Sequence, residues 1–169
     1  FVADRNNIPR TWMDHGAWPL STTLLYLDQT GDLDLLLEDR EYFRDPQLFR
    51  CRRQDPAWSE AYGHALRTRR GRVYRGSVVE HLLVQHLSAF FNVGEHNVCR
   101  LEGADWNDGL DMAPRRGESA AFSAFYAWNL GRLAELAERL EARGHRRLRV
   151  FEELLMLLDR LPGQEPVRY

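Results

Sequence analysis

Four stretches of the chain carry apolar side chains at the three- and four-residue spacing of an amphipathic helix. We expect helices over residues 18–29, from residue 77 to about 93, and over 119–143 and 145–161. Residues that commonly end helices follow these stretches in turn: Gly31, Gly94, Gly144 and the pair Pro162-Gly163. The apolar spacing therefore predicts a largely helical protein.

Two polar capping signals favour helix starts within this pattern. Asp32 can cap a leucine-rich run over residues 33–37. Ser77 and Glu80 have the spacing of a capping box, in which the hydroxyl and the carboxylate each satisfy a free backbone N–H. No stretch shows sustained alternation of β-branched and polar residues, so we expect little sheet.

Two long polar segments separate the predicted helices. Residues 44–76 contain two prolines and several arginines, which indicates a loop with one or two short helices. Residues 95–117 are rich in Asp, Asn, Gly and Arg and predict a second loop. Successive antiparallel helices joined by long functional loops are typical of a helical bundle or an α/α toroid.

Composition narrows the class of protein. The 169 residues are 44% hydrophobic with a net charge of −2, which excludes a disordered chain and a DNA- or RNA-binding domain that relies on bulk positive charge. No apolar stretch approaches the ~20 residues needed to span a bilayer. Cys51 and Cys99 make neither a disulfide framework nor a metal cage, so we expect a reducing, intracellular setting. The chain begins with Phe1 and closes without a distinctive tail, and we expect it to be a segment of a longer protein.

The densest group of potential catalytic side chains lies in one loop. Residues 102–111 carry four carboxylates around one indole and one amide: Glu102, Asp105, Trp106, Asn107, Asp108 and Asp111. Crowded carboxylates beside an indole can keep one Asp protonated near neutral pH, as a general acid requires. An aromatic face beside polar groups also suits a sugar ring. The alternatives from these residues alone are an acidic turn that caps its own backbone and a calcium loop, although the spacing does not follow the calcium-binding ladder.

Arginines and histidines form two further groups of candidates. A short basic run could bind phosphate or nucleic acid, but most such runs are solvated loops. Its members are Arg67, Arg69, Arg70, Arg72 and Arg75. His81, His86 and His96 lack the four-residue spacing of zinc-binding helices, so we expect structural roles and no metal site.

Several motifs resemble glycoside hydrolase family 94. Asp105-Trp106-Asn107-Asp108-Gly109, followed by Gly117-Glu118-Ser119 at a helix start, is similar to the catalytic loop of that family. Three more segments are similar and occur in the expected order: residues 13–18, residues 26–32 and Glu80-His81. The family includes cellobiose, chitobiose and β-1,2-oligoglucan phosphorylases and the phosphorylase-like domain of cyclic β-1,2-glucan synthase.

The resemblance implies an enzyme that performs inverting, reversible phosphorolysis of a β-glucosidic bond to α-D-glucose 1-phosphate. Asp108 corresponds to the general acid and Trp106 to a side chain that lines the subsite of the cleaved sugar. Asp105 and Asn107 are assigned to sugar hydroxyls or to the geometry of the loop. Inorganic phosphate is the co-substrate and nucleophile, and no cofactor is expected. Because phosphate is already anionic, the second carboxylate of an inverting hydrolase is unnecessary.

The resemblance also implies a fold and partners. We expect an all-α partial (α/α)6 toroid of antiparallel helical hairpins over residues 1–169, with no second domain, in a cytoplasmic enzyme. A β-linked gluco-oligosaccharide and phosphate are the expected partners, without nucleic acid or membrane, and a homodimer is a candidate assembly. The segment alone is expected to be inactive. Two other functions remain open: an inverting glycoside hydrolase of the same fold, and a non-catalytic helical interaction or carbohydrate-binding module.

Overall fold

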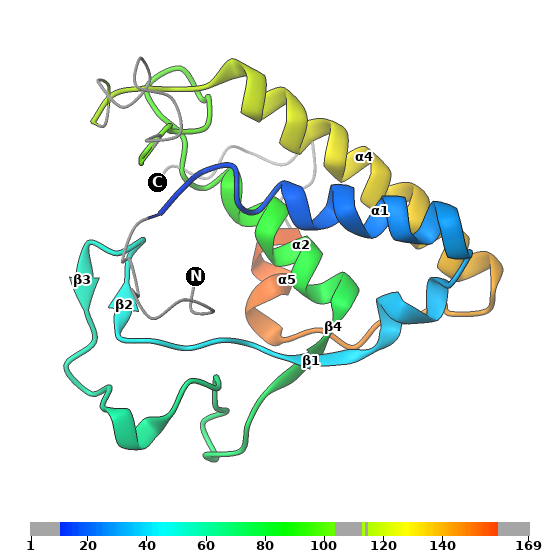
Figure 1. The fold of residues 1–169 in the computed structure, drawn as a ribbon, viewed down its shortest axis with the longest axis horizontal. Coiled ribbons are helices and arrows are strands. Elements are labelled where there is room, and N and C mark those ends of the chain that lie inside the picture. The colour runs from blue at the N-terminus through cyan, green and yellow to red at the C-terminus, as the bar shows by residue number, and fades with distance from the viewer. Residues whose placement is uncertain (1–10, 104–112, 114, 159–169) are drawn as a thin grey trace.

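Three helices form the body of the protein in a computed structural model that describes residues 11–103, 113 and 115–158. They are α1 (Trp18–Thr30), α2 (Val78–Ala89) and α4 (Ala120–Ala142), and a short helix, α5 (Glu152–Leu158), packs against α2 (Figure 1). None of the helices described is long and apolar enough to cross a membrane.

Local signals explain where α1 and α4 begin and end. Pro19 lies in the first turn of α1, where its missing N–H leaves no intrahelical bond unmade. Gly31 ends that helix with a φ of 69°, and its N–H bonds to Leu27. Ser119 caps α4 by accepting a hydrogen bond from the Phe122 N–H at 3.2 Å. Both helices therefore match their predicted ranges to within one residue at each end.

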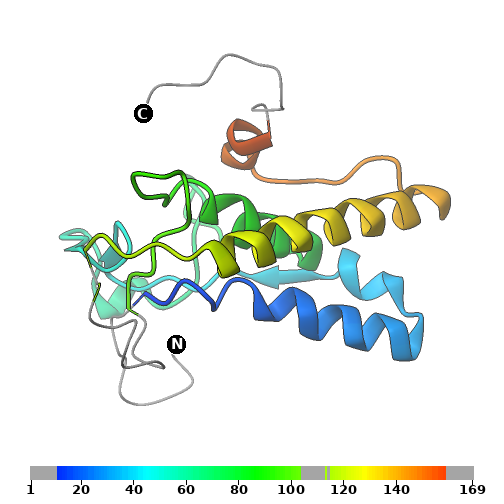
Figure 2. The same cartoon turned by 90° about the horizontal axis from the view of Figure 1, so that it is seen from above.

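Contacts at both ends define the direction of the helices. Asn129, in the first half of α4, donates a hydrogen bond to Ala17 just before α1, and Arg143, just after α4, bonds to the Gly31 carbonyl at the far end of α1. The helices α1 and α4 consequently run in the same direction, side by side in Figure 1 and Figure 2. The helix α2 packs against α4 and runs in the opposite direction to α1, since the last turns of α2 lie beside Gly16.

Leucines supply most of the core. The main cluster joins α1, α2, α4 and the 3-10 helix η1 (Leu33–Leu37) through ten buried side chains: Leu20, Leu24, Leu27, Leu33, Leu36, Val79, Leu82, Leu133, Leu136 and Leu140. A second cluster, of Met13, Ala17, Cys99, Leu101 and Tyr126, lies at the other end of the helices. This second cluster supports the loops described below.

The polar segment predicted as a loop over 44–76 contains short ladders. The strand β1 (Asp39–Glu41) pairs antiparallel with β4 (Arg75–Ser77), and β2 (Gln47–Leu48) pairs with β3 (Arg53–Gln54). The 3-10 helix η2 (Glu60–Tyr62) is the short helix expected there. The expectation of little sheet is confirmed for the residues described, because each strand has only two or three residues.

Two predicted helix boundaries were wrong. The helix α2 ends at Ala89, not near Gly94, because Gly94 bonds to Val98 in a turn of its own. Residues 145–150 are irregular, and α5 begins only at Glu152. There the Phe151 N–H donates to the buried carboxylate of Glu80 at 2.8 Å, a contact between residues far apart in sequence.

The two predicted caps also differ from expectation. Ser77 does accept a hydrogen bond from the Glu80 N–H, at 3.3 Å. The Glu80 carboxylate, however, binds tyrosines and Phe151. Asp32 precedes η1 without a side-chain cap, and its carboxylate accepts a hydrogen bond from Tyr26. In both cases the carboxylate that was predicted to cap the backbone accepts hydrogen bonds from other residues instead.

Candidate functional site

The predicted catalytic and sugar-binding residues Asp105, Trp106, Asn107 and Asp108 lie outside the described residues. The flanking residues fix where this segment starts and returns. The Leu101 N–H donates to the Gly117 carbonyl and the Ser119 N–H to the Cys99 carbonyl, both at 2.9 Å. The chain therefore leaves and rejoins the fold at one antiparallel pairing, which we call the neck (residues 99–101 with 117–119).

An ion pair holds the outgoing side of the neck. The Nε of Arg50 lies 2.8 Å from both carboxylate oxygens of Glu102, and the Arg50 Nη2 bonds to the same group. Only 9% of the Glu102 side chain is accessible, so the carboxylate is largely shielded from solvent, whereas Arg50 is exposed. Paired N–H groups in one plane match a carboxylate geometrically and give a strong, directional contact.

Backbone geometry in the same place is unusual. Phe49, Arg50, Cys51 and Glu102 all have positive φ values, between 48° and 62°. Non-glycine residues in the left-handed region each cost of order 1 kcal/mol, and such residues cluster where the surrounding structure fixes a functional group. Here the strain presents Arg50 to Glu102, three residues before the predicted catalytic motif begins at Asp105.

Glu118 holds the returning side of the neck. Its carboxylate accepts hydrogen bonds from the backbone N–H of His96 at 3.0 Å and from the His96 Nδ1 at 2.6 Å. The hydrogen bonds from His96 keep the pKa of Glu118 below its ordinary value. A Cβ on Gly94 would lie 2.0 Å from the Glu118 Oε1, so a glycine is needed for the turn to pass this carboxylate.

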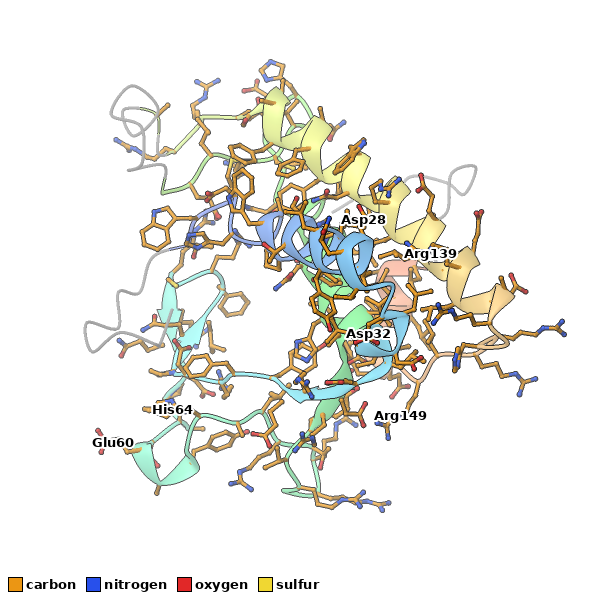
Figure 3. All side chains as sticks on the ribbon, turned by 45° about the vertical axis from the view of Figure 1, so that its right-hand side comes forward. Asp28, Asp32, Glu60, His64, Arg139 and Arg149 are labelled. Atoms are coloured by element: carbon orange, nitrogen blue, oxygen red, sulfur yellow. The ribbon has the colours of Figure 1, made fainter. Side chains whose placement is uncertain are left out.

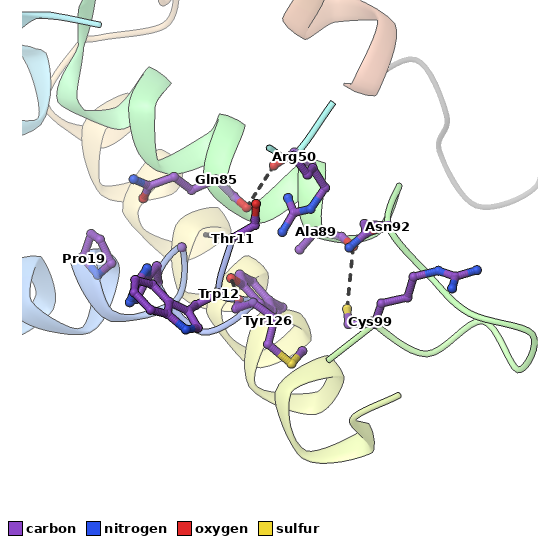
Figure 4. A pocket seen from close by; sticks show the side chains of 14 residues that line it. Thr11, Trp12, Pro19, Arg50, Gln85, Ala89, Asn92, Cys99 and Tyr126 are labelled. Atoms are coloured by element: carbon purple, nitrogen blue, oxygen red, sulfur yellow. Dashed lines mark hydrogen bonds between the residues drawn. The ribbon is translucent and has the colours of Figure 1, made fainter. Parts of the chain in front are cut away.

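A cavity of about 410 Å³ opens beside the neck (Figure 4). Its lining combines aromatic rings, amides, a guanidinium and the segment before α1: Thr11, Trp12, Met13, His15, Gly16, Pro19, Arg50, Gln85, Ser88, Ala89, Asn92, Cys99, Arg100 and Tyr126. The volume lies within the usual range of small-molecule sites. Aromatic faces suit the C–H face of a sugar, and amide and guanidinium groups suit its hydroxyls.

The cavity adjoins the start of the predicted catalytic segment. The Gly103 N–H donates to the Thr11 carbonyl at 3.2 Å, and Glu102 pairs with Trp12 in an isolated bridge. A Cβ on Gly103 would lie 3.5 Å from the Trp12 indole. Residues 102–103 thus pass directly along the cavity wall before the Asp105–Asp108 motif.

Two oxygens of cavity residues are buried without a hydrogen-bond partner in the described structure. They are the Oγ1 of Thr11 and the Oε1 of Gln85. An unsatisfied buried polar atom costs about 1–3 kcal/mol. A ligand hydroxyl that reaches either oxygen would recover part of this cost.

Residues 13–17, which we call the wall segment, form one side of the cavity. The Tyr126 hydroxyl donates to the Met13 carbonyl at 2.5 Å. A Cβ on Gly16 would lie 2.8 Å from the Tyr126 hydroxyl oxygen, so a glycine is required for this close approach. The wall segment falls within residues 13–18, which resemble a segment of glycoside hydrolase family 94.

The three histidines of the metal alternative lie in separate environments. His81 stacks on Tyr42 with ring centroids 3.6 Å apart, and His86 is buried against Asn129. His96 bonds to Glu118 in the neck. Among the residues described, no three His, Cys, Asp or Glu side chains come together as a metal site would need.

The arginine run forms an exposed turn. Arg67 pairs with Val73 in an isolated bridge, and its guanidinium bonds to the Gly71 carbonyl at 2.9 Å. Arg75 forms an ion pair with Glu41 at 3.1 Å. These local bonds are what a solvated loop would show.

A second cavity, of about 580 Å³, lies over the buried Glu80. The hydroxyls of Tyr42 and Tyr74, which line it, donate to that carboxylate at 3.0 Å and 2.9 Å. Burial, together with Glu80, raises the pKa of Tyr74 to about 12 and that of Tyr42 further. Sequence reasoning missed this cluster, since no spacing links residues 42, 74 and 80.

Comparison with family models decides the class of the chain. The model of the glycosyl hydrolase 94 superfamily catalytic domain matches residues 69–153, half of the chain.

The chain belongs to the glycosyl hydrolase 94 superfamily.

The match covers α2, the neck, the predicted catalytic segment and α4 of this glycosyl hydrolase 94 domain. The resemblance inferred from the sequence motifs is confirmed at the level of the family. The wall segment and Arg50 lie outside the matched residues. Arg50 joins the candidate site through the structure alone, whereas the wall segment also falls in residues 13–18, which resemble a family segment. No curated protein matches the chain.

Proposed function

We propose that this glycosyl hydrolase 94 domain catalyses inverting phosphorolysis of a β-glucosidic bond. Membership of the superfamily supports a carbohydrate-active enzyme. The cavity beside the neck supports the more specific proposal of glucoside cleavage. Glu102 and Gly103 pass along its wall of aromatic and polar side chains, directly before the Asp105–Asp108 motif.

Each proposed role follows from the chemistry of the reaction. Asp108 protonates the leaving glycosidic oxygen while inorganic phosphate attacks the anomeric carbon from the opposite face. The C–O bond breaks as the new C–O bond to phosphate forms, which gives an α-sugar 1-phosphate. Trp106 lines the subsite of the cleaved sugar, and Asp105 and Asn107 bind hydroxyls or shape the loop. No cofactor takes part in this scheme.

The proposal extends to the fold and the partners. The helical body becomes part of an (α/α)6 toroid completed by residues beyond this segment, and the segment alone is inactive. The substrate is a β-linked gluco-oligosaccharide with phosphate, and exposed apolar side chains such as Trp18, Leu25 and Trp128 would allow a homodimer. Both cysteines are unpaired, which fits a reducing cytoplasmic setting.

Product analysis tests the reaction. The full-length enzyme is incubated with cellobiose, sophorose or laminaribiose, with and without inorganic phosphate, and glucose 1-phosphate is measured. Phosphorolysis predicts glucose 1-phosphate only when phosphate is present. Free glucose formed at the same rate without phosphate would instead identify an inverting hydrolase that uses water.

Substitution of the general acid tests whether the domain is catalytic. Asp108→Asn should lower turnover by about 10²-fold or more while sugar binding persists, because the amide cannot donate the proton. Asp28→Asn, on the exposed face of α1 (Figure 3), is the matched control and should leave turnover unchanged. Equal turnover in both variants would remove Asp108 from the mechanism and leave a non-catalytic module.

A further inference from the structure

A buried polar pair joins α2 and α4 to the wall segment. His86 and Asn129 are both completely inaccessible to solvent. The Asn129 Nδ2 lies 2.9 Å from the His86 Nε2 and 3.2 Å from the Ala17 carbonyl oxygen. Neither residue lines the cavity itself, but Ala17 ends the segment that does.

The partners determine where the protons lie. The His86 Nδ1 is 2.7 Å from the Leu82 carbonyl, which can only accept, so Nδ1 carries a proton. In the neutral ring Nε2 is then an acceptor, and the Asn129 amide donates one N–H to it. The other N–H of the same amide is left for the Ala17 carbonyl. Because the His86 Nε2 and the Ala17 carbonyl are both acceptors and both face Nδ2, they fix the orientation of the Asn129 amide.

A second proton on His86 would break this arrangement. Nε2–H would face the N–H groups of Asn129, a contact of donor with donor. Rotating the amide by 180° would turn its Oδ1 toward Nε2–H but also toward the Ala17 carbonyl oxygen, which would then face an oxygen instead of a donor. In the present orientation that Oδ1 is buried without a partner in the described structure. Asn129 can thus serve a cationic His86 or the Ala17 carbonyl, but not both.

Other titratable groups near His86 do not offer an alternative partner for Nε2. On α4, the ring of Tyr126 meets the imidazole edge to face at 5.4 Å, and burial raises the pKa of this tyrosine to about 12. The wall segment contributes Asp14 and His15, and the Asp14 carboxylate accepts a hydrogen bond from the Trp18 indole at 3.0 Å. The neck brings Cys99 near the Tyr126 phenol. In the described part of the chain no carboxylate bonds to His86 Nε2. Burial accordingly lowers the pKa of His86 below its ordinary value.

We propose that His86 and Asn129 are positioning residues that hold the wall segment of the cavity in place only while His86 is uncharged, so that acidification loosens this wall. The importance of the wall for saccharide binding rests on the proposed function. The proton-linked loosening itself does not, because it involves only residues of α2, α4 and the wall segment.

Two measurements on the chain test the proposal without a substrate. Long-range ¹H–¹⁵N NMR reports the tautomer and the titration of His86. Hydrogen exchange, corrected for the intrinsic effect of pH, reports the protection of a peptide over residues 11–20, with residues 133–142 of α4 as the internal control. We expect His86 to be the Nδ1–H tautomer. We also expect hydrogen exchange in residues 11–20 to become about tenfold faster on acidification, which is the scale of losing one hydrogen bond. The midpoint of this change should coincide with the midpoint of the His86 titration.

Three variants separate a positioning role from a purely structural one. His86→Gln retains an acceptor for Asn129 but cannot titrate, so residues 11–20 should stay protected at low pH. Asn129→Asp presents oxygen to both His86 and Ala17 and should loosen residues 11–20 already at neutral pH. His145→Gln removes an exposed imidazole elsewhere and should behave like the wild type.

The outcomes are decisive even if one variant fails to fold. Wild-type protection that does not change through the His86 titration would overturn the proposal, as would an Nε2–H tautomer. An equal loss in residues 133–142 would indicate global unfolding and would also overturn it. A pH response in His86→Gln equal to that of the wild type would assign the effect to another group.

Discussion

Replacing Gly16 by alanine tests how closely the wall segment approaches α4. The backbone of Gly16 is outside the positive-φ region, so alanine meets no conformational barrier there. The added Cβ would instead lie 2.8 Å from the Tyr126 hydroxyl oxygen, while its next neighbours, both atoms of Gln85, are at 3.4 and 3.5 Å. Steric conflict with a single atom therefore decides the effect of the substitution.

The magnitude follows from two opposing effects. Overpacking of a close contact costs about 1–3 kcal/mol. Alanine also restricts the unfolded chain, which stabilises the fold by about 0.4–1 kcal/mol. We expect Gly16→Ala to lower the free energy of unfolding by about 1–2 kcal/mol. Tyr126→Phe removes the bond to the Met13 carbonyl and should cost a similar amount, because a buried acceptor is left unsatisfied.

A double-mutant cycle isolates the contact. In the Tyr126→Phe background the clashing oxygen is gone, so Gly16→Ala should be nearly neutral and the two effects should couple by about 1–2 kcal/mol. Urea unfolding followed by circular dichroism gives all four free energies, provided the m values agree. Gly131→Ala, inside α4 with no atom near its added Cβ, is the control and should stabilise by about 0.5–1 kcal/mol. Additivity of the two substitutions within about 0.5 kcal/mol would refute the steric argument.

Three further predictions concern the polar contacts. Tyr74→Phe removes a donor to the buried Glu80 and should lower the free energy of unfolding by about 1–3 kcal/mol in urea titrations; an unchanged value would mean that the carboxylate finds another donor. Arg50→Gln removes the close, paired contact of the Glu102 carboxylate and leaves only Arg52 at 3.8 Å. It should raise the dissociation constant for cellobiose in the full-length enzyme at least severalfold by calorimetry, and unaltered affinity would separate this ion pair from the sugar site. The hydrogen bonds from His96 hold the pKa of Glu118 below its ordinary value, so their contribution to stability is complete above that value and is lost as pH falls through the folded-state pKa. Unfolding curves from pH 6 to 3 should show a smaller acid loss in Glu118→Gln than in the wild type, and parallel curves would contradict this.

The helices could be predicted from the sequence because their signals are local. In α1 and α4 the apolar spacing, a first-turn proline, a serine cap and a following glycine all act within a few residues. The start of α5 and the role of Glu80 could not be predicted in this way. They depend on Tyr42, Tyr74 and Phe151, which the chain brings to that carboxylate from 38, 6 and 71 residues away.

The candidate site shows the same division. The motif at Asp105–Asp108 was identifiable by its residue types, and residues 13–18 by their similarity to a family segment. Arg50 and Gln85 became candidates only through the structure, since an arginine in a polar loop and a glutamine in a helix have no distinctive spacing. Their function depends on which elements fold beside them, and this information is distributed over the whole chain.

The neck has a consequence for how the domain can change over evolutionary time. Because Leu101 and Gly117 are bonded to each other, the chain between them starts and ends at two fixed points of the fold. The entropy cost of a loop between fixed ends grows by only about 0.6 kcal/mol for each doubling of its length. Under the proposed function, insertions or exchanges in this stretch would alter which sugars are accepted and would leave the leucine core in place, so that specificity and stability could diverge separately.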